Sequence, residues 1–147
     1  MNHSFLLKSA KWSVEGHHFQ RDRGFTPLRG FIIISWKQET WFKMDTLLSV
    51  NQKSSSEIVS QCKGHFDNQR KSYTYVLQHS ILGNIEGEGW LSSDSIIQHY
   101  WIVGATQRRL GFDTFYCLSE DTYHLTNVYL ESHNLTSTME ATLKHLI

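Results

Sequence analysis

The fold is decided by the stretch Leu82–Tyr116, which consists of LGNIEGEGWL (82–91), SSDS (92–95), IIQHYWIVG (96–104), the short connection ATQ (105–107) and RRLGFDTFY (108–116). Residues 82–91 alternate glutamates with glycines and Ile85, and the two later segments are rich in β-branched and aromatic residues. Short turn-forming segments separate the three. The stretch contains no proline and no helical periodicity. It therefore predicts three consecutive antiparallel strands joined by short connections.

The same pattern extends along the chain and predicts about ten strands at the spacing typical of sandwiches and barrels, roughly 8–12 residues. Nearly all connections are short enough for hairpins, and closing a long meander removes its exposed edges. We therefore predict an all-β, single up-and-down antiparallel β-barrel in preference to a sandwich, which needs longer crossovers. The expected strands are Lys11–Phe19, Phe31–Trp36, Trp41–Val50, Glu57–Phe66, Ser72–Ser80, Gly83–Leu91, Ser95–Val103, Gln107–Leu118, Thr122–Ser132 and Thr136–Ile147.

Two segments leave alternatives open. Residues 20–30 contain the only proline and are expected to form a loop, either a plain surface loop or a lid across one end of the barrel. Residues 136–147 contain good helix formers, and Ser137 with Glu140 would make a capping box. We favour a strand there, because a barrel needs its last strand to meet its first.

The composition indicates one domain, residues 1–147, with a packed core. Hydrophobic residues make up 39% of the chain, and the charged fraction of 19% is too low for a disordered chain. Residues 1–73 hold 11 basic and 6 acidic residues (+5), and residues 74–147 hold 3 and 8 (−5). The neutral total and the lack of a basic run argue against a nucleic-acid partner. The asymmetry indicates two differently charged walls or, alternatively, a surface for homo-oligomerisation.

Compartment and redox state follow from the cysteines and the N-terminal residues. Cys62 and Cys117 both fall in expected strands, and we expect free thiols rather than a disulfide. The apolar run at residues 5–7 is too short for a signal-peptide core, and no segment approaches a membrane span. We therefore expect a cytoplasmic protein.

The first and last expected strands carry a family resemblance. Lys11-Trp12-Ser13-Val14-Glu15-Gly16 resembles the first strand of calycin barrels, the lipocalin-like and fatty-acid-binding-protein-like proteins, and residues 137–144 are similar to closing strands of small, uncharacterised bacterial barrels. Residues 6–12 followed by His17-His18 also resemble lipocalin-like bilin lyases of cyanobacteria. The resemblance implies a barrel that binds an apolar or tetrapyrrole ligand. A disulfide and a capping helix pair, found in members of the group, have no counterpart here.

Glycines and carboxylates alternate in the deciding stretch. Gly87 and Gly89 share one face with Ile85, which predicts a bend or a large side chain packed over bare backbone. Glu86 and Glu88 share the opposite face. Paired carboxylates can serve acid–base chemistry, but outward-facing, solvated glutamates explain the pattern more simply.

Arg108 is the strongest candidate for a polar ligand anchor. It shares a parity with Leu110, Phe112 and Tyr116. If that face points inward, an arginine inside an apolar barrel needs an anionic partner, and a ligand carboxylate would supply one. Alternatively, Arg108 pairs with one of the outward glutamates or extends to the rim.

Aromatic side chains and histidines complete the candidate residues. Seven aromatic side chains are expected to line a ligand pocket or, equally, to fill the barrel. None of the nine histidines has the spacing of a known metal motif, so we expect no metal and no cofactor. The aromatic candidates are Trp41, Tyr73, Tyr75, Tyr100, Trp101, Phe112 and Tyr116.

The leading functional hypothesis is a barrel that binds a small, mostly apolar ligand without catalysis, such as a fatty acid or tetrapyrrole, with an anionic group if Arg108 faces inward. A filled barrel acting as a protein-interaction module is one alternative. A lyase-like tetrapyrrole or bilin chaperone, using Glu86, Glu88 or a histidine, is the other.

Overall fold

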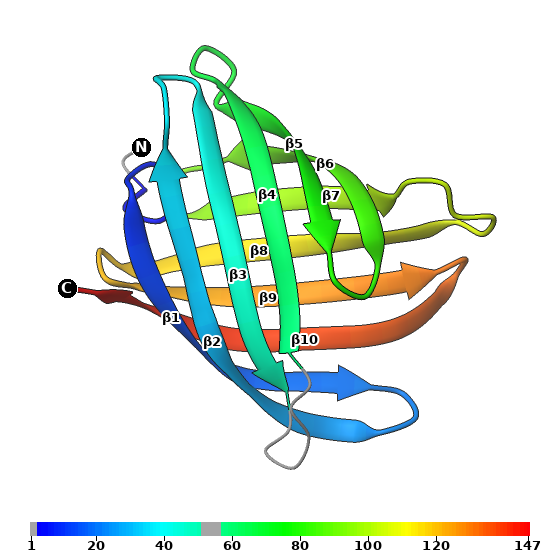
Figure 1. The fold of residues 1–147 in the computed structure, drawn as a ribbon. Helices are drawn as coiled ribbons and strands as arrows, with labels where there is room; N and C mark the ends of the chain where they lie inside the picture. Colours follow the sequence, from blue (N-terminus) through cyan, green and yellow to red (C-terminus); the bar gives the residue numbers. More distant parts are fainter. Residues whose placement is uncertain (1–2, 51–56) are drawn as a thin grey trace.

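The computed structural model describes residues 3–50 and 57–147, which form ten antiparallel strands and no helix. Each strand pairs with the next in sequence and β1 pairs with β10, so the sheet closes into an up-and-down barrel (Figure 1). The predicted fold class is confirmed. The strands are β1 (Ala10–Gln20), β2 (Gly24–Trp36), β3 (Trp41–Val50), β4 (Glu57–Asp67), β5 (Ser72–His79), β6 (Gly83–Leu91), β7 (Ser95–Ile102), β8 (Arg109–Ser119), β9 (Thr122–Glu131) and β10 (Asn134–Leu146).

The last segment of the chain closes the barrel. Strand β10 pairs with β1 from Lys11↔Leu146 to Gln20↔Ser137. The strand predicted over residues 136–147 is therefore confirmed, and the helical alternative is wrong. Pairing on both sides overrides the helix propensity of these residues, because β10 lies between two strands, β1 and β9, that supply backbone partners.

The loop predicted over residues 20–30 is wrong. Strand β1 runs to Gln20 and β2 already begins at Gly24, which has a positive φ of 70° in the tight turn between them. Pro27 is tolerated in β2 because it lies beyond the pairing with β3, which begins at Leu28. Among the described residues, β1 is the strand that flanks Pro27, so the missing N–H group interrupts no described ladder with a second neighbour.

Large rings lie over glycines on the inner wall, as the two glycines of β6 predict. Tyr75 pairs with Gly87 and Tyr73 with Gly89 across β5 and β6. A Cβ atom on Gly87 would lie 2.3 Å from Cζ of Tyr75, and one on Gly89 would lie 2.1 Å from Cζ of Tyr73. Each ring thus rests on bare backbone, a position that no residue larger than glycine allows. Glu86 and Glu88, on the opposite face, are exposed.

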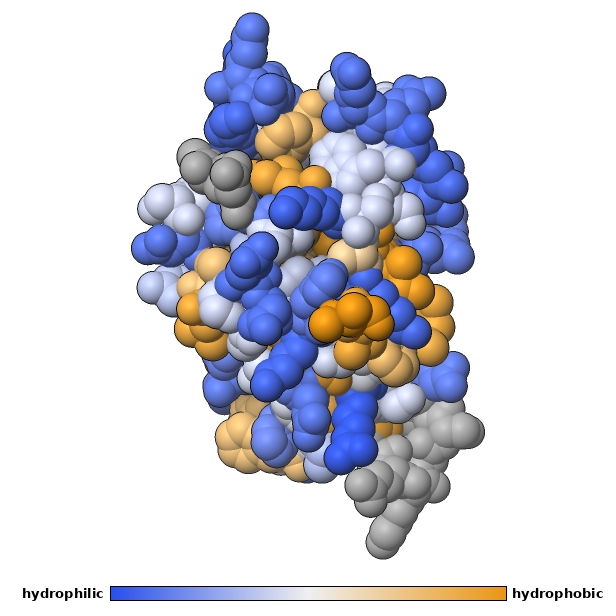
Figure 2. All heavy atoms as spheres, turned by 90° about the vertical axis from the view of Figure 1, so that its left-hand side faces the viewer, coloured by the Kyte–Doolittle hydropathy of each residue, from blue (hydrophilic) through white to orange (hydrophobic). Residues whose placement is uncertain are grey.

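The N-terminal residues close one end of the barrel. Phe5 and Leu6 have no exposed surface, and the Phe5 ring centroid lies 4.8 Å from that of Phe115 and 5.3 Å from that of Trp12. The indole Nε1 of Trp36 donates to the carbonyl of Leu6 at 2.7 Å. These residues form a plug, defined as His3–Leu6, on the side where both chain ends lie (Figure 1). Seen from that side, the surface is largely hydrophilic with apolar patches between the hydrophilic residues (Figure 2).

His3 anchors this plug with both ring nitrogens. Nε2 lies 2.7 Å from the carbonyl oxygen of Ser92, which can only accept, so Nε2 carries the proton. Nδ1 lies 2.7 Å from the hydroxyl of Tyr123, which can donate a hydrogen bond or accept one. The plug is therefore held by hydrogen bonds as well as by apolar packing.

The strand order also separates the charges. The basic half of the sequence supplies β1–β4 and the start of β5, and the acidic half supplies the remaining strands. Since both halves are contiguous in the barrel, opposite walls differ in charge. Within residues 3–50 and 57–147, no helix has the length and apolar character needed to cross a membrane.

Removing the Phe5 ring from the plug should lower the stability of the barrel. Phe5→Ala leaves a cavity among Trp12, Phe115 and Tyr123 and is expected to lower the free energy of unfolding by about 3 kcal/mol. Phe25→Ala is the matched control, because Phe25 is 76% exposed, and should change it by less than about 1 kcal/mol. Urea denaturation measures both. Equal stability of the two variants would contradict the plug.

Candidate ligand-binding cavity

The end of the barrel opposite the plug contains a cavity of about 270 Å³. Its lining extends from the rim at Gln20, His79 and Thr136 to Phe115 in the middle of the barrel. Most of the wall is apolar. Representative apolar lining residues are Ile32, Met44, Leu48, Leu77, Ile85 and Leu125.

A hydrogen-bonded polar cluster lies on the wall of this cavity. Asp113 of β8 accepts from Nε2 of Gln98 at 2.9 Å and from Nδ2 of Asn127 at 2.7 Å, one donor for each carboxylate oxygen. Asn127 also donates to the hydroxyl of Tyr100 at 3.0 Å, and the hydroxyl of Tyr73 donates to Gln98 at 2.6 Å. Adjacent strands β7, β8 and β9 supply the three central residues, since Asp113 pairs with Gln98 on one side and Asn127 on the other.

Burial changes the acidity of Asp113. Desolvation raises the pKa of this carboxyl to about 6, against the lowering effect of the hydrogen bonds from Asn127 and Gln98. The side chain keeps some exposed surface because it faces the cavity rather than a packed core. At neutral pH Asp113 is therefore mostly ionised, and neither lysine nor arginine occurs among the described residues that line the cavity.

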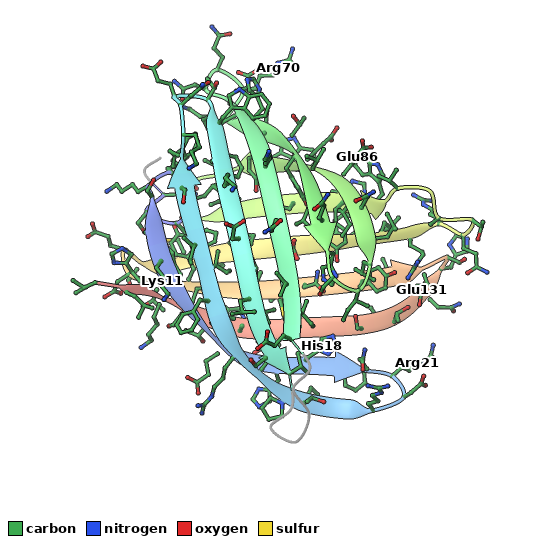
Figure 3. All side chains as sticks on the ribbon, in the orientation of Figure 1. Lys11, His18, Arg21, Arg70, Glu86 and Glu131 are labelled. Atoms are coloured by element: carbon green, nitrogen blue, oxygen red, sulfur yellow. The ribbon has the colours of Figure 1, made fainter. Side chains whose placement is uncertain are left out.

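Titratable groups also mark the rim of the cavity. Burial lowers the pKa of His18 and of His79, so both imidazoles are mainly neutral at pH 7. Nε of Arg109 donates to the hydroxyl of Tyr129 at 2.8 Å and lies 3.2 Å from a carboxylate oxygen of Glu131. Figure 3 shows His18 and Glu131 at this end of the molecule and Arg70 at the other. The charge of Arg109 is thus already paired with the carboxylate of Glu131.

The predicted site residues divide between the two faces of the wall. Tyr73, Tyr75 and Tyr100 point inward; Tyr75 and Tyr100 line the cavity, and Tyr73 supports it through Gln98. Their role in ligand binding stays a prediction. The other predicted residues lie on the outside or at an exposed turn, away from the cavity: Arg108, Trp41, Trp101, Phe112 and Tyr116.

The parity of β8 is the reason why Arg108 does not face the cavity. Asp113 and Phe115 point inward, whereas Phe112 and Tyr116 are 42% and 46% exposed. On the outer face Phe112 stacks on His99 of β7, with 4.7 Å between ring centroids. Such cross-strand pairs make the outer face of β8 as apolar as its inner face, so alternation alone does not identify the inward parity.

The polar cluster itself was not predicted from the sequence. Asn127 lies between Leu125 and Tyr129 on one parity, and Gln98 lies between Ile96 and Tyr100 on another. The available signal was that β7 and β9 each carry one amide residue on an otherwise apolar face. Only β8 separates these two strands. Pairing β7, β8 and β9 in register would have placed the carboxyl of Asp113 between the two amides.

The other candidate groups do not gather into a site. Within the described part of the chain, no three histidine, cysteine, aspartate or glutamate side chains are arranged to hold a metal ion. Glu86 accepts from the indole of Trp101 on the outer face and points away from the barrel (Figure 3). Cys62 and Cys117 are free, as predicted, and burial raises the pKa of Cys62 to about 12.

A second hollow, of about 490 Å³, lies outside the barrel across β1, β2 and β10. Charged residues border it, including Glu15 and Arg29, whose side chains are each 75% exposed and 4.0 Å apart. An exposed ion pair of this kind contributes little to stability, because water screens the attraction between the two charges. The interior cavity is therefore the better candidate.

Comparison with known proteins identifies the architecture only. No protein-family model and no curated protein matches the chain. Among solved structures, the chain is similar to a redesigned β-barrel, mFAP1, bound to DFHBI, with a TM-score of 0.51 and 11% identity over 98% of this chain and 99% of that one. It is also similar to a de novo designed fluorescence-activating β-barrel, with a TM-score of 0.50 and 12% identity over 99% and 100% of the two chains. At these identities the similarity shows the barrel fold.

Asp113→Asn should alter how stability depends on pH. Because the folded-state pKa of Asp113 is raised from 3.8 to about 6, the folded protein binds this proton more tightly than the unfolded chain does. The unfavourable contribution of the ionised carboxyl to stability is absent below about pH 4, grows between about pH 4 and 6, and is constant at higher pH. Between about pH 4 and 7.5, the unfolding free energy of the variant relative to wild type should rise by about 2 kcal/mol, somewhat under the full linkage value because the group faces the cavity.

Urea denaturation at several pH values measures this difference. Asp94→Asn makes the same chemical change on an exposed turn and serves as the control. A difference between Asp113→Asn and wild type that stays constant across this pH range would show that the carboxyl is not desolvated.

Proposed function

We propose that this barrel binds a small, mostly apolar molecule in the cavity at the end opposite the plug. The observation that carries the proposal is a half-filled interior: the plug and Trp12 fill one end, while about 270 Å³ remains at the other. Ligand sites are typically concave, apolar and equipped with a few convergent polar groups. The cavity has this character, with Asp113, Gln98 and Asn127 as its polar groups.

The similar designed barrel mFAP1, bound to DFHBI, supports the proposal by analogy of architecture. The fold does not fix the ligand. The calycin resemblance of residues 11–16 agrees with a ligand-binding barrel, and we retain calycin membership as a prediction. We likewise keep the cytoplasmic location and the homo-oligomer as predictions.

The size and chemistry of the cavity favour a ligand smaller than those first considered. Binding pockets commonly measure about 300 to 1,000 Å³, and this cavity of about 270 Å³ lies just below that range. A tetrapyrrole or a long fatty acid would extend beyond it. The catalytic alternative loses support because Glu86 and Glu88 lie outside the barrel.

Filling the cavity tests the proposal. Ser60 points into the cavity, and Ser60→Phe should weaken binding of the neutral fluorescent probe N-phenyl-1-naphthylamine about tenfold or more, because the new ring occupies the space the probe needs. Val59 is the adjacent residue on the outer face, 38% exposed, so Val59→Phe is the matched control and should leave the affinity unchanged. Probe fluorescence gives the affinity, and circular dichroism verifies folding. Undiminished binding by folded Ser60→Phe, or equal loss in both variants, would place the probe outside the cavity.

A further inference from the structure

We infer that the cavity selects ligands that carry a protonated amine, which Asp113 holds as an ion pair. This inference rests on the proposed function and assigns the class of ligand. It reverses the expectation of an anionic ligand, which depended on Arg108 facing inward. Arg108 is exposed, and an acidic side chain occupies the interior instead.

The charge of Asp113 has no cationic partner within the described protein. Its two oxygens accept one amide N–H each, from Gln98 and Asn127. A carboxylate has about four acceptor positions, so two remain for a ligand. Buried charges in proteins are normally paired, and amide dipoles compensate a full charge only in part. A ligand ammonium group supplies the missing charge and up to three N–H donors.

The groups around Asp113 leave its charge unopposed. Tyr73 and Tyr75 of β5, Tyr100 of β7 and Cys62 of β4 are its titratable neighbours, and burial raises the pKa of each, so all four are neutral at pH 7. Towards the rim, Tyr129 of β9 and the histidines of β1 and β5 are also neutral at this pH. The tyrosine rings of the wall add π faces that attract cations.

The arginine at the rim of the cavity favours the same choice of ligand. Arg109 is engaged by Tyr129 and by Glu131, with its Nε 3.2 Å from the carboxylate. A ligand carboxylate in the cavity would therefore meet the negative charge of Asp113, and the described lining residues include no lysine or arginine to offset it. Like charges at close range disfavour such a ligand.

A matched ligand series tests the inference. 1-Naphthylmethylamine, 1-naphthalenemethanol and 1-naphthoate share one apolar ring system and differ in charge. At pH 7.5 the ammonium compound should bind about tenfold more tightly than the alcohol, and the carboxylate should bind most weakly, because a hydrogen bond to a charged group exceeds a neutral one by about this factor. Isothermal titration calorimetry and naphthalene fluorescence give the affinities.

Asp113→Asn should remove the preference, bringing the ammonium compound to the affinity of the alcohol while the affinity of the alcohol stays within about threefold. Asp94→Asn, on an exposed turn, should keep the preference. If the alcohol and the amine bind wild type equally, the inference fails while the proposed function stands. If no member of the series binds, both fail.

The pH dependence tests the same ion pair without a change at position 113. Because the pKa of Asp113 is about 6, affinity for the ammonium compound should fall about tenfold from pH 7.5 to pH 5, and affinity for the alcohol should stay constant. His18 and His79 also line the cavity and gain positive charge when protonated, so the titration is repeated in the His18→Gln, His79→Asn double variant. An ammonium affinity independent of pH in that variant would overturn the inference.

Discussion

Closure of the sheet between β1 and β10 is the constraint on which the rest of the structure depends. A closed sheet of ten strands has every second side chain pointing into one enclosed space, and that space has to be filled from within or left hollow. The plug formed by His3–Leu6 fills one end. Among the described residues no equivalent segment enters the other end, and the cavity lies there. The plug and the cavity are thus two outcomes of the same closure.

The side chains of the interior wall differ in how tightly they are packed. Tyr73 and Tyr75 rest on glycines of β6, so large rings line the wall where any other residue beneath them would collide. Asp113 contrasts with this packing, because an apolar residue there would avoid the desolvation of a carboxyl. A position at which local stability is given up in an otherwise consistent core is where a functional group is expected. The hydrogen bonds from Gln98 and Asn127 hold the carboxyl in one orientation.

Alternation predicted the architecture well and the orientation of individual strands less well. The strand over 83–91 could be oriented from sequence, since Gly87 and Gly89 exclude large side chains on one face and the glutamates favour water on the other. The orientation of strand β8 could not be predicted, because its outer face carries large aromatic residues such as Phe112, which stacks on His99, while its inner face carries the charged Asp113. For Arg108 the predicted site was wrong for the same reason. The β8 residues that line the cavity, Asp113 and Phe115, have the parity opposite to that of Arg108. Residues 20–30 were mispredicted for a different reason: Pro27 is compatible with a strand that, within the described residues, has β1 as its one neighbour at that point.

The plug has one more consequence, for how the protein can be handled. Strand β1 begins and β10 ends at the plugged end, so the first and last described residues, His3 and Ile147, lie away from the mouth of the cavity (Figure 1). An affinity tag, a fluorescent reporter or a linker to a solid support can be joined at either end without covering the mouth. The barrel is thereby suited to immobilisation in an array, where every copy would present its opening to the solution.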